Sequence, residues 1–372
     1  MEPVVIVGGG IIGTSVARYL AAESVPVRLL EKDTLGAGTT SDSVAVFVRH
    51  QTDPDTVEQE LRTAAWAEYE PMIDAGAIDY ERIGTLQTTR STAELSAFET
   101  AKAELESLGV TAEVRDGEGL AEFGLDTEVF AGGLYVPSDG YFDPTEIIQQ
   151  FAGEARDHGA TIETGVEVTD IQLGDGAVRG VETTDGTIPA QAVVNAAGPW
   201  APQVNAMVDV SLPLRHTFGP IIVLNSDEEI RMPLTFFEDG YYLREEGERQ
   251  AFAGKLGTDY DTAVDVDPDA AHSVDETMYQ EMATLIEEAV PGLADAEISS
   301  EWVGVRTVTP DGHPFVGPTD VNRFHVAVGM SGHGVTLAPA VGTLLAEYIT
   351  TGDRPPLLEP LLPGRETARR AP

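Results

Sequence analysis

Three glycines near the amino terminus have a spacing that could bind a pyrophosphate. Gly8, Gly10 and Gly13 follow the apolar run Val-Val-Ile-Val at 4–7. In a strand–turn–helix unit, such glycines allow a tight turn, a close approach of the backbone to phosphates, and close packing of helix on strand. Glu31 ends the next apolar run and could accept hydrogen bonds from ribose hydroxyls. The spacing predicts a dinucleotide site, and a glycine-rich turn without a ligand is the alternative.

The elements that must position these residues follow from the apolar pattern. The helix that we expect after the glycine turn would point its first N–H groups at the phosphates. A loop of small and polar residues at 35–41 could bring further N–H groups against an extended ligand. The expected helices cover 11–23, 55–75 and 143–159, and the expected strands cover 4–7, 27–30, 84–88, 132–136, 161–163, 166–173, 178–184 and 192–196.

Residues 213–304 have a different pattern, which is typical of an antiparallel sheet covered by a helix. Strands fit 219–224, 240–244 and 250–255, and an amphipathic helix fits 275–290. After residue 305 the first pattern returns, with a strand at 324–328, a glycine-rich turn at 329–334 and a helix over 336–348. We expect the final residues, rich in Pro and Arg, to form a surface tail.

These patterns predict an α/β fold with two interleaved domains. The first is a discontinuous Rossmann-like dinucleotide-binding domain made of residues 1–82, 142–212 and 305–372. The second is an α+β substrate domain built on an antiparallel sheet, made of residues 83–141 and 213–304.

The composition is strongly acidic. With 63 acidic and 22 basic residues, the net charge is −41, and lysine occurs only at Lys32, Lys102 and Lys255. Molar salt shortens the Debye length to about 3 Å and screens this self-repulsion. We therefore expect a salt-loving organism and a protein that needs high salt. The charge also argues against nucleic acid or an anionic membrane as a partner.

Composition also excludes several kinds of site. The chain has no cysteine, and its histidines are not paired at metal-ligand spacing, so we expect no metal site. No apolar stretch reaches the ~18 residues of a membrane helix, and the amino terminus lacks the pattern of a secretion signal. We expect a cytoplasmic protein with no membrane insertion.

Four blocks of the sequence resemble a known family. They are Gly8–Gly13 with Glu31, Asn195–Pro202, Ala253–Gly257, and Gly304–Gly317 continuing to Pro339. Their order and spacing resemble the D-amino-acid oxidase-type flavoproteins, which include glycine oxidase, sarcosine oxidase and related dehydrogenases. The resemblance implies FAD rather than NAD, because in that family the second glycine-rich turn reaches the flavin. It also implies non-covalent FAD, since Gly304 stands where sarcosine oxidase has its flavin-linking cysteine, and no histidine stands near Asp42.

The resemblance makes the dinucleotide domain the FAD-binding domain and indicates which residues contact the cofactor. A helix that begins near Gly334–Thr336 would direct its positive end toward the negative charge of a reduced flavin. The cofactor-binding residues that we expect are Gly8, Gly10, Ile11, Ile12, Gly13, Glu31, Lys32, Gly38, Thr39, Thr40, Ser41, Val168, Ala197, Gly198, Trp200, Gly304, Arg306, Ser331, Gly332, His333, Gly334, Val335 and Thr336.

The resemblance also implies the catalytic candidates. Arg306 matches the arginine that binds the substrate carboxylate in glycine oxidase, and Arg49 matches a carboxylate-binding arginine of sarcosine oxidase. Bidentate arginine geometry suits either role, and a structural ion pair is the alternative. Tyr241 matches a tyrosine that assists the clamp, and Lys255 matches a lysine near the flavin that promotes reaction with oxygen. His333, in the second glycine-rich turn, completes the set.

We therefore predict FAD-dependent oxidation of a small amino acid or secondary amine of the glycine, sarcosine or D-amino-acid type. Hydride moves from the α-carbon to the flavin, and oxygen is the expected electron acceptor. Thr336 stands where sarcosine oxidase has a second carboxylate-binding lysine, which weakens the case for sarcosine itself. Two alternatives stay open: a dehydrogenase that uses a quinone or partner flavoprotein or oxidises a 2-hydroxy acid, and a silent flavin-binding subunit of a hetero-oligomer. The sequence is compatible with a homo-oligomer as well as with a hetero-oligomer.

Overall fold

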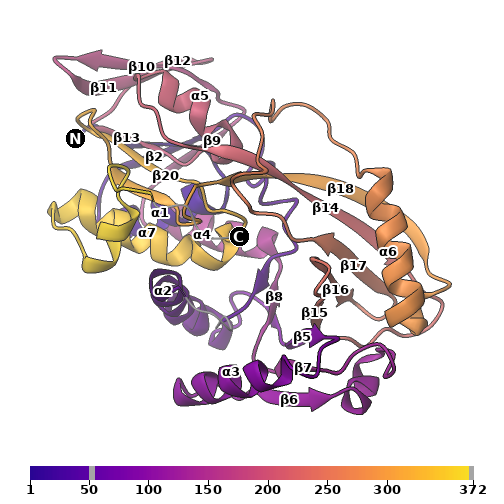
Figure 1. Cartoon of the computed structure of the whole chain (residues 1–372). Helices are drawn as coiled ribbons and strands as arrows, with labels where there is room; N and C mark the ends of the chain where they lie inside the picture. Colours follow the sequence, from indigo (N-terminus) through magenta and orange to yellow (C-terminus); the bar gives the residue numbers. More distant parts are fainter. Residues whose placement is uncertain (50–54, 368–372) are drawn as a thin grey trace.

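The computed structural model describes residues 1–49 and 55–367, and a mainly parallel sheet forms its nucleotide-binding side (Figure 1). The strand order of this sheet is β19-β20-β13-β1-β2-β9. Strand β1 pairs in parallel with β2 and β13, and β19 is the antiparallel edge strand. The strands are β1 (Val4–Val7), β2 (Val27–Glu31), β9 (Thr161–Thr164), β13 (Ala192–Asn195), β19 (Phe315–Pro318) and β20 (Phe324–Val328).

Helices cover this parallel sheet on the face opposite a small hairpin layer. Helix α1 packs against both α4 and α7, and α2 packs against α7. The carboxylates of Asp55 and Asp143 accept N–H groups in the first turns of α2 and α4, which explains where those helices begin. These helices are α1 (Ile11–Ala22), α2 (Thr56–Asp74), α4 (Pro144–Asp157) and α7 (Gly334–Thr351).

The hairpin layer lies across the other face of the parallel sheet (Figure 1). Its strands pair in the order β10-β11-β12. The first turn contains Asp175 and Gly176, both at positive φ, as the sequence pattern predicts. The elements of this layer are β10 (Val168–Gly174), β11 (Ala177–Thr183), β12 (Gly186–Pro189), η2 (Gly198–Trp200) and α5 (Ala201–Ala206).

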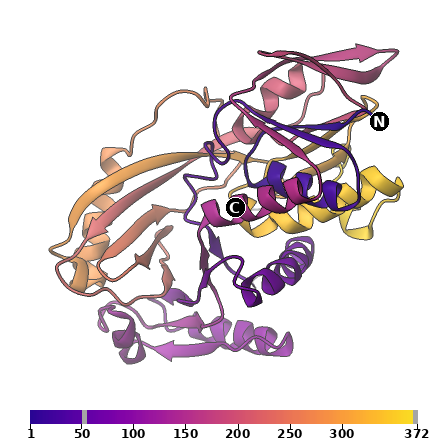
Figure 2. The same ribbon diagram turned by 180° about the vertical axis from the view of Figure 1, so that it is seen from behind.

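A second, mainly antiparallel sheet extends away from the first (Figure 2). Its order is β18-β14-β17-β16-β15-β5-β7-β6, with only β15 and β5 parallel among the pairs. The strands are β5 (Thr85–Thr89), β6 (Glu113–Asp116), β7 (Gly132–Val136), β14 (Arg215–Asn225), β15 (Leu234–Phe236), β16 (Tyr241–Glu246), β17 (Gln250–Lys255) and β18 (Glu297–Val308).

Helices also cover parts of the antiparallel sheet. Helix α6 (Glu276–Ala289) buries Met278, Met282 and Leu285 against one face. Helix α3 (Leu95–Ser107), which the sequence pattern did not reveal, packs on β6 and β7. The remaining elements are β3 (Val46–Phe47), β4 (Tyr80–Glu81), β8 (Gly140–Phe142), η1 (Glu118–Phe123), η3 (Pro291–Leu293) and η4 (Pro356–Leu361).

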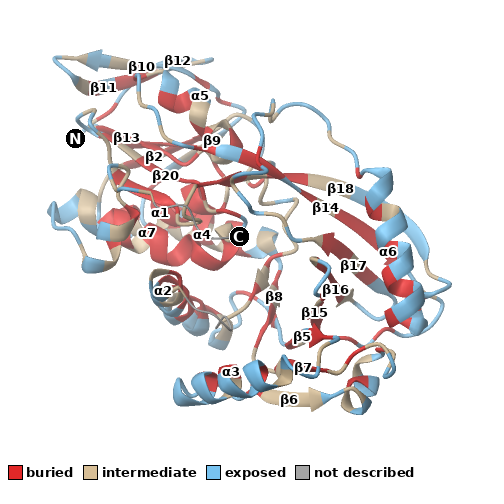
Figure 3. Ribbon diagram, viewed as in Figure 1, coloured by how far each residue is buried: buried red, intermediate tan, exposed pale blue. Residues whose placement is uncertain are grey.

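The carboxyl-terminal segment corrects one expectation from the sequence. In place of a surface tail, residues up to 367 pack on the protein, and Leu358 and Leu361 of η4 are fully buried. The Arg365 guanidinium donates to Asp311, with Nε 2.8 Å from Oδ2, and also donates to the carbonyl of His313. Figure 3 shows that buried residues concentrate in the two sheets and in the helix faces that cover them.

The predicted α/β fold with a parallel and an antiparallel sheet is confirmed. Strands of the parallel sheet come from the three chain segments predicted for the FAD-binding domain, and strands of the antiparallel sheet come mainly from the other two. Strand β18 crosses the predicted boundary at 304/305, and the boundaries stay a prediction. Within the part of the chain that the structure describes, no helix is both long and apolar enough to cross a membrane.

Candidate active site

One cavity of about 1030 Å³ lies where the two sheets meet. Residues of the parallel sheet, such as Val7 and Glu31, line one part, and residues of the antiparallel sheet, such as Tyr242 and Arg306, line the other. A long pocket that spans a nucleotide-type turn and a second sheet can place a cofactor against a substrate.

The nucleotide end of the cavity is built by glycine backbone. Gly8 has φ +107°, and a Cβ there would lie 2.6 Å from the carbonyl oxygen of Ala196. A Cβ on Gly13 would overlap the carbonyl of Gly8, so helix α1 can pack this close to β1 only with glycine. Gly10 and Ile11 line the cavity where α1 begins, and the first N–H groups of a helix lack intrahelical partners. This cradle fits a pyrophosphate.

Glu31 and Lys32 lie beside that cradle. The Glu31 carboxylate accepts the N–H of Gly9 at 2.6 Å and the N–H of Asp33 at 2.9 Å, which fixes its position at the cavity wall. Lys32 Nζ lies 2.6 Å from Asp269 Oδ1 and 4.0 Å from the centre of the Trp200 ring. Asp269 belongs to the long loop after β17, so this loop reaches across to the nucleotide end.

A second glycine-rich turn, residues 329–334, faces the middle of the cavity. Gly329, Ser331 and Gly332 have positive φ, and the Ser331 N–H donates to the Thr307 carbonyl at 2.9 Å. Helix α7 begins directly after the turn, and no side chain caps its N-terminus. The turn lines the cavity together with the first residues of α7, so a positive helix end faces the space where the flavin ring would lie.

A buried ion pair on α2 supports His333 at the start of α7. Arg62, which is 2% exposed, lies 2.6 Å from the Glu58 carboxylate, and its Nη2 lies 2.9 Å from His333 Nδ1. A guanidinium can only donate, so His333 Nδ1 is the acceptor of this hydrogen bond, and Nδ1 also lies 3.7 Å from Glu58 Oε1. Arg62 and His333 both line the cavity. Arg62 was not a sequence candidate, although the Glu58–Arg62 spacing of i, i+4 on a helix is visible in the sequence.

Arg306 on β18 brings a positive charge into the end of the cavity that the antiparallel sheet lines, which is the predicted substrate end. Its guanidinium lies over Gly219, where a Cβ would come within 2.7 Å of Nη2. It donates only to backbone carbonyls, those of Gly257 at 3.2 Å, Lys255 at 3.4 Å and Phe218 at 3.4 Å. Burial lowers the pKa of Arg306, yet a guanidinium stays charged at neutral pH. No carboxylate of the described residues forms an ion pair with it, so an anion from solution can.

Tyr242 on β16 lies next to that charge. Its ring packs over Gly254, where a Cβ would overlap the ring, and Tyr242 is 5% exposed. Burial raises the pKa of Tyr242, while the nearby positive charge of Arg306 acts in the opposite direction. The hydroxyl therefore stays protonated and can donate a hydrogen bond at the cavity wall.

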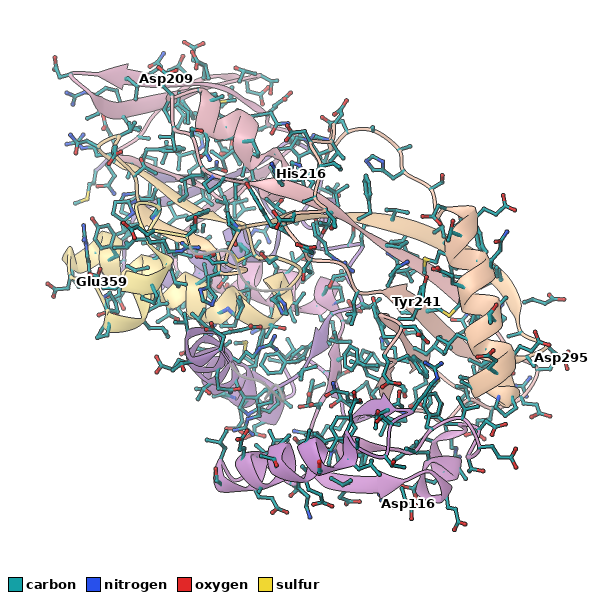
Figure 4. The ribbon with its side chains drawn as sticks, in the orientation of Figure 1. Asp116, Asp209, His216, Tyr241, Asp295 and Glu359 are labelled. Carbon is teal, nitrogen blue, oxygen red and sulfur yellow. The ribbon has the colours of Figure 1, made fainter. Side chains whose placement is uncertain are left out.

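Tyr241 and Lys255 are not among the residues that line the cavity, and their catalytic roles stay a prediction. Lys255 Nζ donates to the Tyr241 hydroxyl at 3.0 Å and lies 3.2 Å from Glu281 Oε2, and Tyr241 itself donates to Glu281 on α6 (Figure 4). The Lys255 side chain is 44% exposed. Because successive residues of a strand point to opposite faces, Tyr242 faces the cavity, whereas Tyr241 and its register partner Lys255 face α6.

Arg49 also lies away from the cavity lining. Its guanidinium carbon lies 5.2 Å from the centre of the Trp66 ring, and its backbone N–H donates to buried Asp139 at 3.0 Å. Two expected cofactor contacts, Gly13 and Ser41, are not in the lining either. Gly13 serves the packing of α1, and the Ser41 hydroxyl donates to the Gly38 carbonyl at 2.9 Å.

The structure brings the other expected cofactor residues together along the cavity. They are Gly8, Gly10, Ile11, Ile12, Glu31, Lys32, Gly38, Thr39, Thr40, Val168, Ala197, Gly198, Trp200, Gly304, Arg306, Ser331, Gly332, His333, Gly334, Val335 and Thr336. Asp42 packs against Gly304 in the same wall, and burial raises its pKa. A cradle of glycines, a ribose-facing carboxylate and a helix end at mid-cavity fit FAD along its length.

This fold and site define a nucleotide-dependent redox enzyme with separate cofactor and substrate sheets. The chain belongs to the FAD dependent oxidoreductase family, whose model matches residues 3–348. The protein is an FAD-dependent oxidoreductase, and FAD is its cofactor.

Relatives in this family have both oxidase and dehydrogenase names. Glycine oxidase of Geobacillus kaustophilus (strain HTA426) is 28% identical over 358 residues, covering 93% of this chain and 92% of that protein. Mitochondrial dimethylglycine dehydrogenase of Rattus norvegicus is 28% identical over 383 residues, which cover 97% of this chain but only 44% of that longer protein. D-amino acid dehydrogenase of Cereibacter sphaeroides (strain ATCC 17029 / ATH 2.4.9) is 30% identical over 280 residues, which cover 73% of this chain and 62% of that protein.

Solved structures share the whole fold. L-proline dehydrogenase from P. horikoshii has a TM-score of 0.86 at 25% identity, covering 97% of this chain and 96% of that one. Glycine oxidase from Geobacillus kaustophilus has a TM-score of 0.83 at 24% identity, and the match covers 98% of this chain and 99% of that one.

Proposed function

We propose that the protein oxidises an amino or imino acid whose carboxylate is held by Arg306 and Tyr242. One observation carries this proposal: the half-buried guanidinium of Arg306 faces the cavity, and within the described residues its hydrogen-bond partners are backbone carbonyls. A bound carboxylate would supply the missing counter-charge with bidentate geometry. Names of relatives support the same class, since they include glycine oxidase and D-amino acid dehydrogenase.

Positioning is the main task of the residues at this site. FAD, when bound, supplies the acceptor for the hydride that leaves the α-carbon. Arg306 and Tyr242 would fix the carboxylate, and a fixed carboxylate restricts where the α-carbon can lie. A substrate that binds with a neutral amine needs no strong side-chain base. The N-terminus of α7, which begins directly after His333, presents N–H donors rather than bases at mid-cavity.

For the electron acceptor, two candidates follow from different observations. Oxygen is the first, and the oxidase names among the relatives support it. A dehydrogenase that passes electrons to a quinone or a partner flavoprotein is the second. The placement of Lys255 favours the second, because the cation expected to promote reaction with oxygen pairs with Glu281 and faces α6.

An anaerobic survey of amino, imino and 2-hydroxy acids in high salt tests this function. We expect amino or imino acids to bleach the flavin absorbance, and 2-hydroxy acids to do so weakly or not at all. The reverse preference would contradict the proposal, and no bleaching by any compound would favour a silent flavin-binding subunit. Peroxide release when air is admitted would identify an oxidase, and its absence together with dye reduction would identify a dehydrogenase.

A further inference from the structure

The substrate end of the cavity extends far beyond Arg306. From Arg306 on β18, the lining continues over Ile221 on β14 and Tyr242 on β16 to Phe236 on β15 and Val136 on β7. Strands β18 and β7 are six strand-to-strand steps apart in the sheet order. At about 4.8 Å a step, the lined face is roughly 29 Å wide. A single extended residue spans only about 3.5 Å, so glycine would leave most of this space unfilled.

The wall beyond Arg306 is apolar along strands β7, β14 and β15. Its lining residues on β7, β14 and β15 are Gly219, Ile221, Leu134, Val136, Leu234 and Phe236. On β5, the hydroxyl of Thr85 donates to Asp139 at 2.7 Å, and the hydroxyl of Thr88 donates to the Phe236 carbonyl at 3.1 Å. Both hydroxyl protons are therefore engaged by the protein. None of the described lining residues on these four strands is ionisable, so a charged group lying against them would be desolvated. Two carboxylates line the cavity next to these strands, those of Glu94 and Glu238, and both already accept a hydrogen bond from the Thr89 hydroxyl.

We propose that the substrate is an amino or imino monocarboxylic acid with an uncharged apolar group of several carbons, rather than glycine or sarcosine. This inference rests on the proposed function, because Arg306 must hold the carboxylate for the apolar group to enter the part of the cavity beyond Arg306, here called the chamber. Phe236 and Val136 are then specificity-determining residues. Each methylene buried against such a wall is worth about 0.8 kcal/mol, which is about a fourfold gain in affinity.

Straight-chain carboxylates from acetate to hexanoate test the inference on the holoenzyme. Their dissociation constants can be measured from the change that each ligand causes in the flavin absorbance spectrum. We expect affinity to rise about fourfold per methylene, and kcat/KM to rise in the same order from glycine to 2-aminohexanoate in whichever enantiomer reacts. Equal dissociation constants along the series, or acetate binding tightest, would overturn the inference.

A charged substitution in the chamber sharpens the test. Phe236→Asp should reduce hexanoate affinity at least tenfold and change acetate affinity less than twofold. Phe252→Asp is the matched control, because Phe252 lies on β17 of the same sheet, is similarly half-buried against Trp302 and is not in the cavity lining. Equal losses in both variants would count against a specificity role for Phe236. If Phe236→Asp does not fold, the ligand series on the unaltered protein still decides.

The same series separates the two proposals. If acetate binds and Arg306→Gln abolishes its binding, but longer chains gain nothing, the carboxylate clamp stands and the apolar substrate class is wrong. If no carboxylate perturbs the flavin spectrum, or if Arg306→Gln leaves all the dissociation constants unchanged, the proposed function itself is wrong.

Discussion

The two ends of the cavity differ in what lines them: mainly backbone groups at the nucleotide end and mainly side chains at the other end. At the nucleotide end, the backbone of Gly8 and Gly10 lines the cradle, and Gly13 lets α1 pack close to β1. At the substrate end, the side chains of Arg306 and Tyr242 supply the charge and the hydrogen-bond donor. A backbone site requires particular residues at particular spacings, whereas a side-chain site requires only that the right strand face points inward. A backbone site can therefore be predicted from the sequence, whereas a side-chain site depends on how the chain folds.

The largest expected effect separates the two arginine candidates. Arg306→Gln should lower kcat/KM by about 2–5 kcal/mol in transition-state terms, because the substrate carboxylate would lose a desolvated charged partner. Arg49→Gln should cost much less, since the Arg49 side chain packs on Trp66 away from the lining. Steady-state kinetics in high salt measure both variants. A larger loss in Arg49→Gln would show that the substrate end is arranged differently from this structure.

A buried carboxyl behind the chamber wall should make stability depend on pH. Burial raises the pKa of Asp139 to about 6, and it accepts hydrogen bonds from Thr85 and from the Arg49 N–H. The folded protein then binds more protons than the unfolded chain between about pH 4 and 6, so this group's contribution to stability falls as pH rises through that window. Relative to Asp139→Asn, the unaltered protein should lose about 3 kcal/mol of unfolding free energy as the pH rises through this window. Denaturant unfolding at pH 4 and pH 7 checks the difference, and a constant difference would refute the buried ionisation.

Glu31→Gln tests the nucleotide end. The Glu31 carboxylate accepts two backbone N–H groups, and an amide would turn a donor toward one of them. We expect FAD affinity to weaken by roughly 1.5–3 kcal/mol, the range for a charge-assisted hydrogen bond, as measured by fluorescence titration of the apoprotein. Glu182→Gln, on strand β11 of the surface hairpin, is the control and should leave FAD affinity unchanged.

FAD that remains in the pellet after acid precipitation would separately refute the prediction of a non-covalent cofactor.

The smallest expected effect concerns Lys255. Its ion pair with Glu281 is exposed, and such pairs contribute about 0–1 kcal/mol to stability. Lys255→Met should therefore change neither flavin reduction by substrate nor reoxidation by oxygen more than about twofold in stopped-flow experiments. A selective slowing of reoxidation by ~10²-fold or more would restore the sequence-based oxidase role and show that Lys255 reaches the flavin.

Local sequence determined the α/β fold class and the nucleotide turn. Gly8 at φ +107° and Gly13 packed on Gly8 need glycine for steric reasons that act within a few residues. Capping Asp143 and the helical apolar period likewise specify where α4 begins and which face it buries. These requirements are local, so the strand–turn–helix units could be predicted without knowing what packs on them.

Tertiary structure alone decided which side chains meet in the cavity. Tyr241 and Tyr242 are neighbours in sequence, and the pairing of β16 with β17 determined that Tyr242 faces inward. Arg62 contacts His333 although 271 residues separate them, and no local pattern encodes that contact. A one-residue shift of a strand reverses every side chain on it, and burial of an ion pair depends on elements from distant parts of the chain. The nucleotide turn could therefore be predicted from glycine spacing, whereas sheet register and packing determined which side chains, Arg306 and Tyr242 among them, line the cavity.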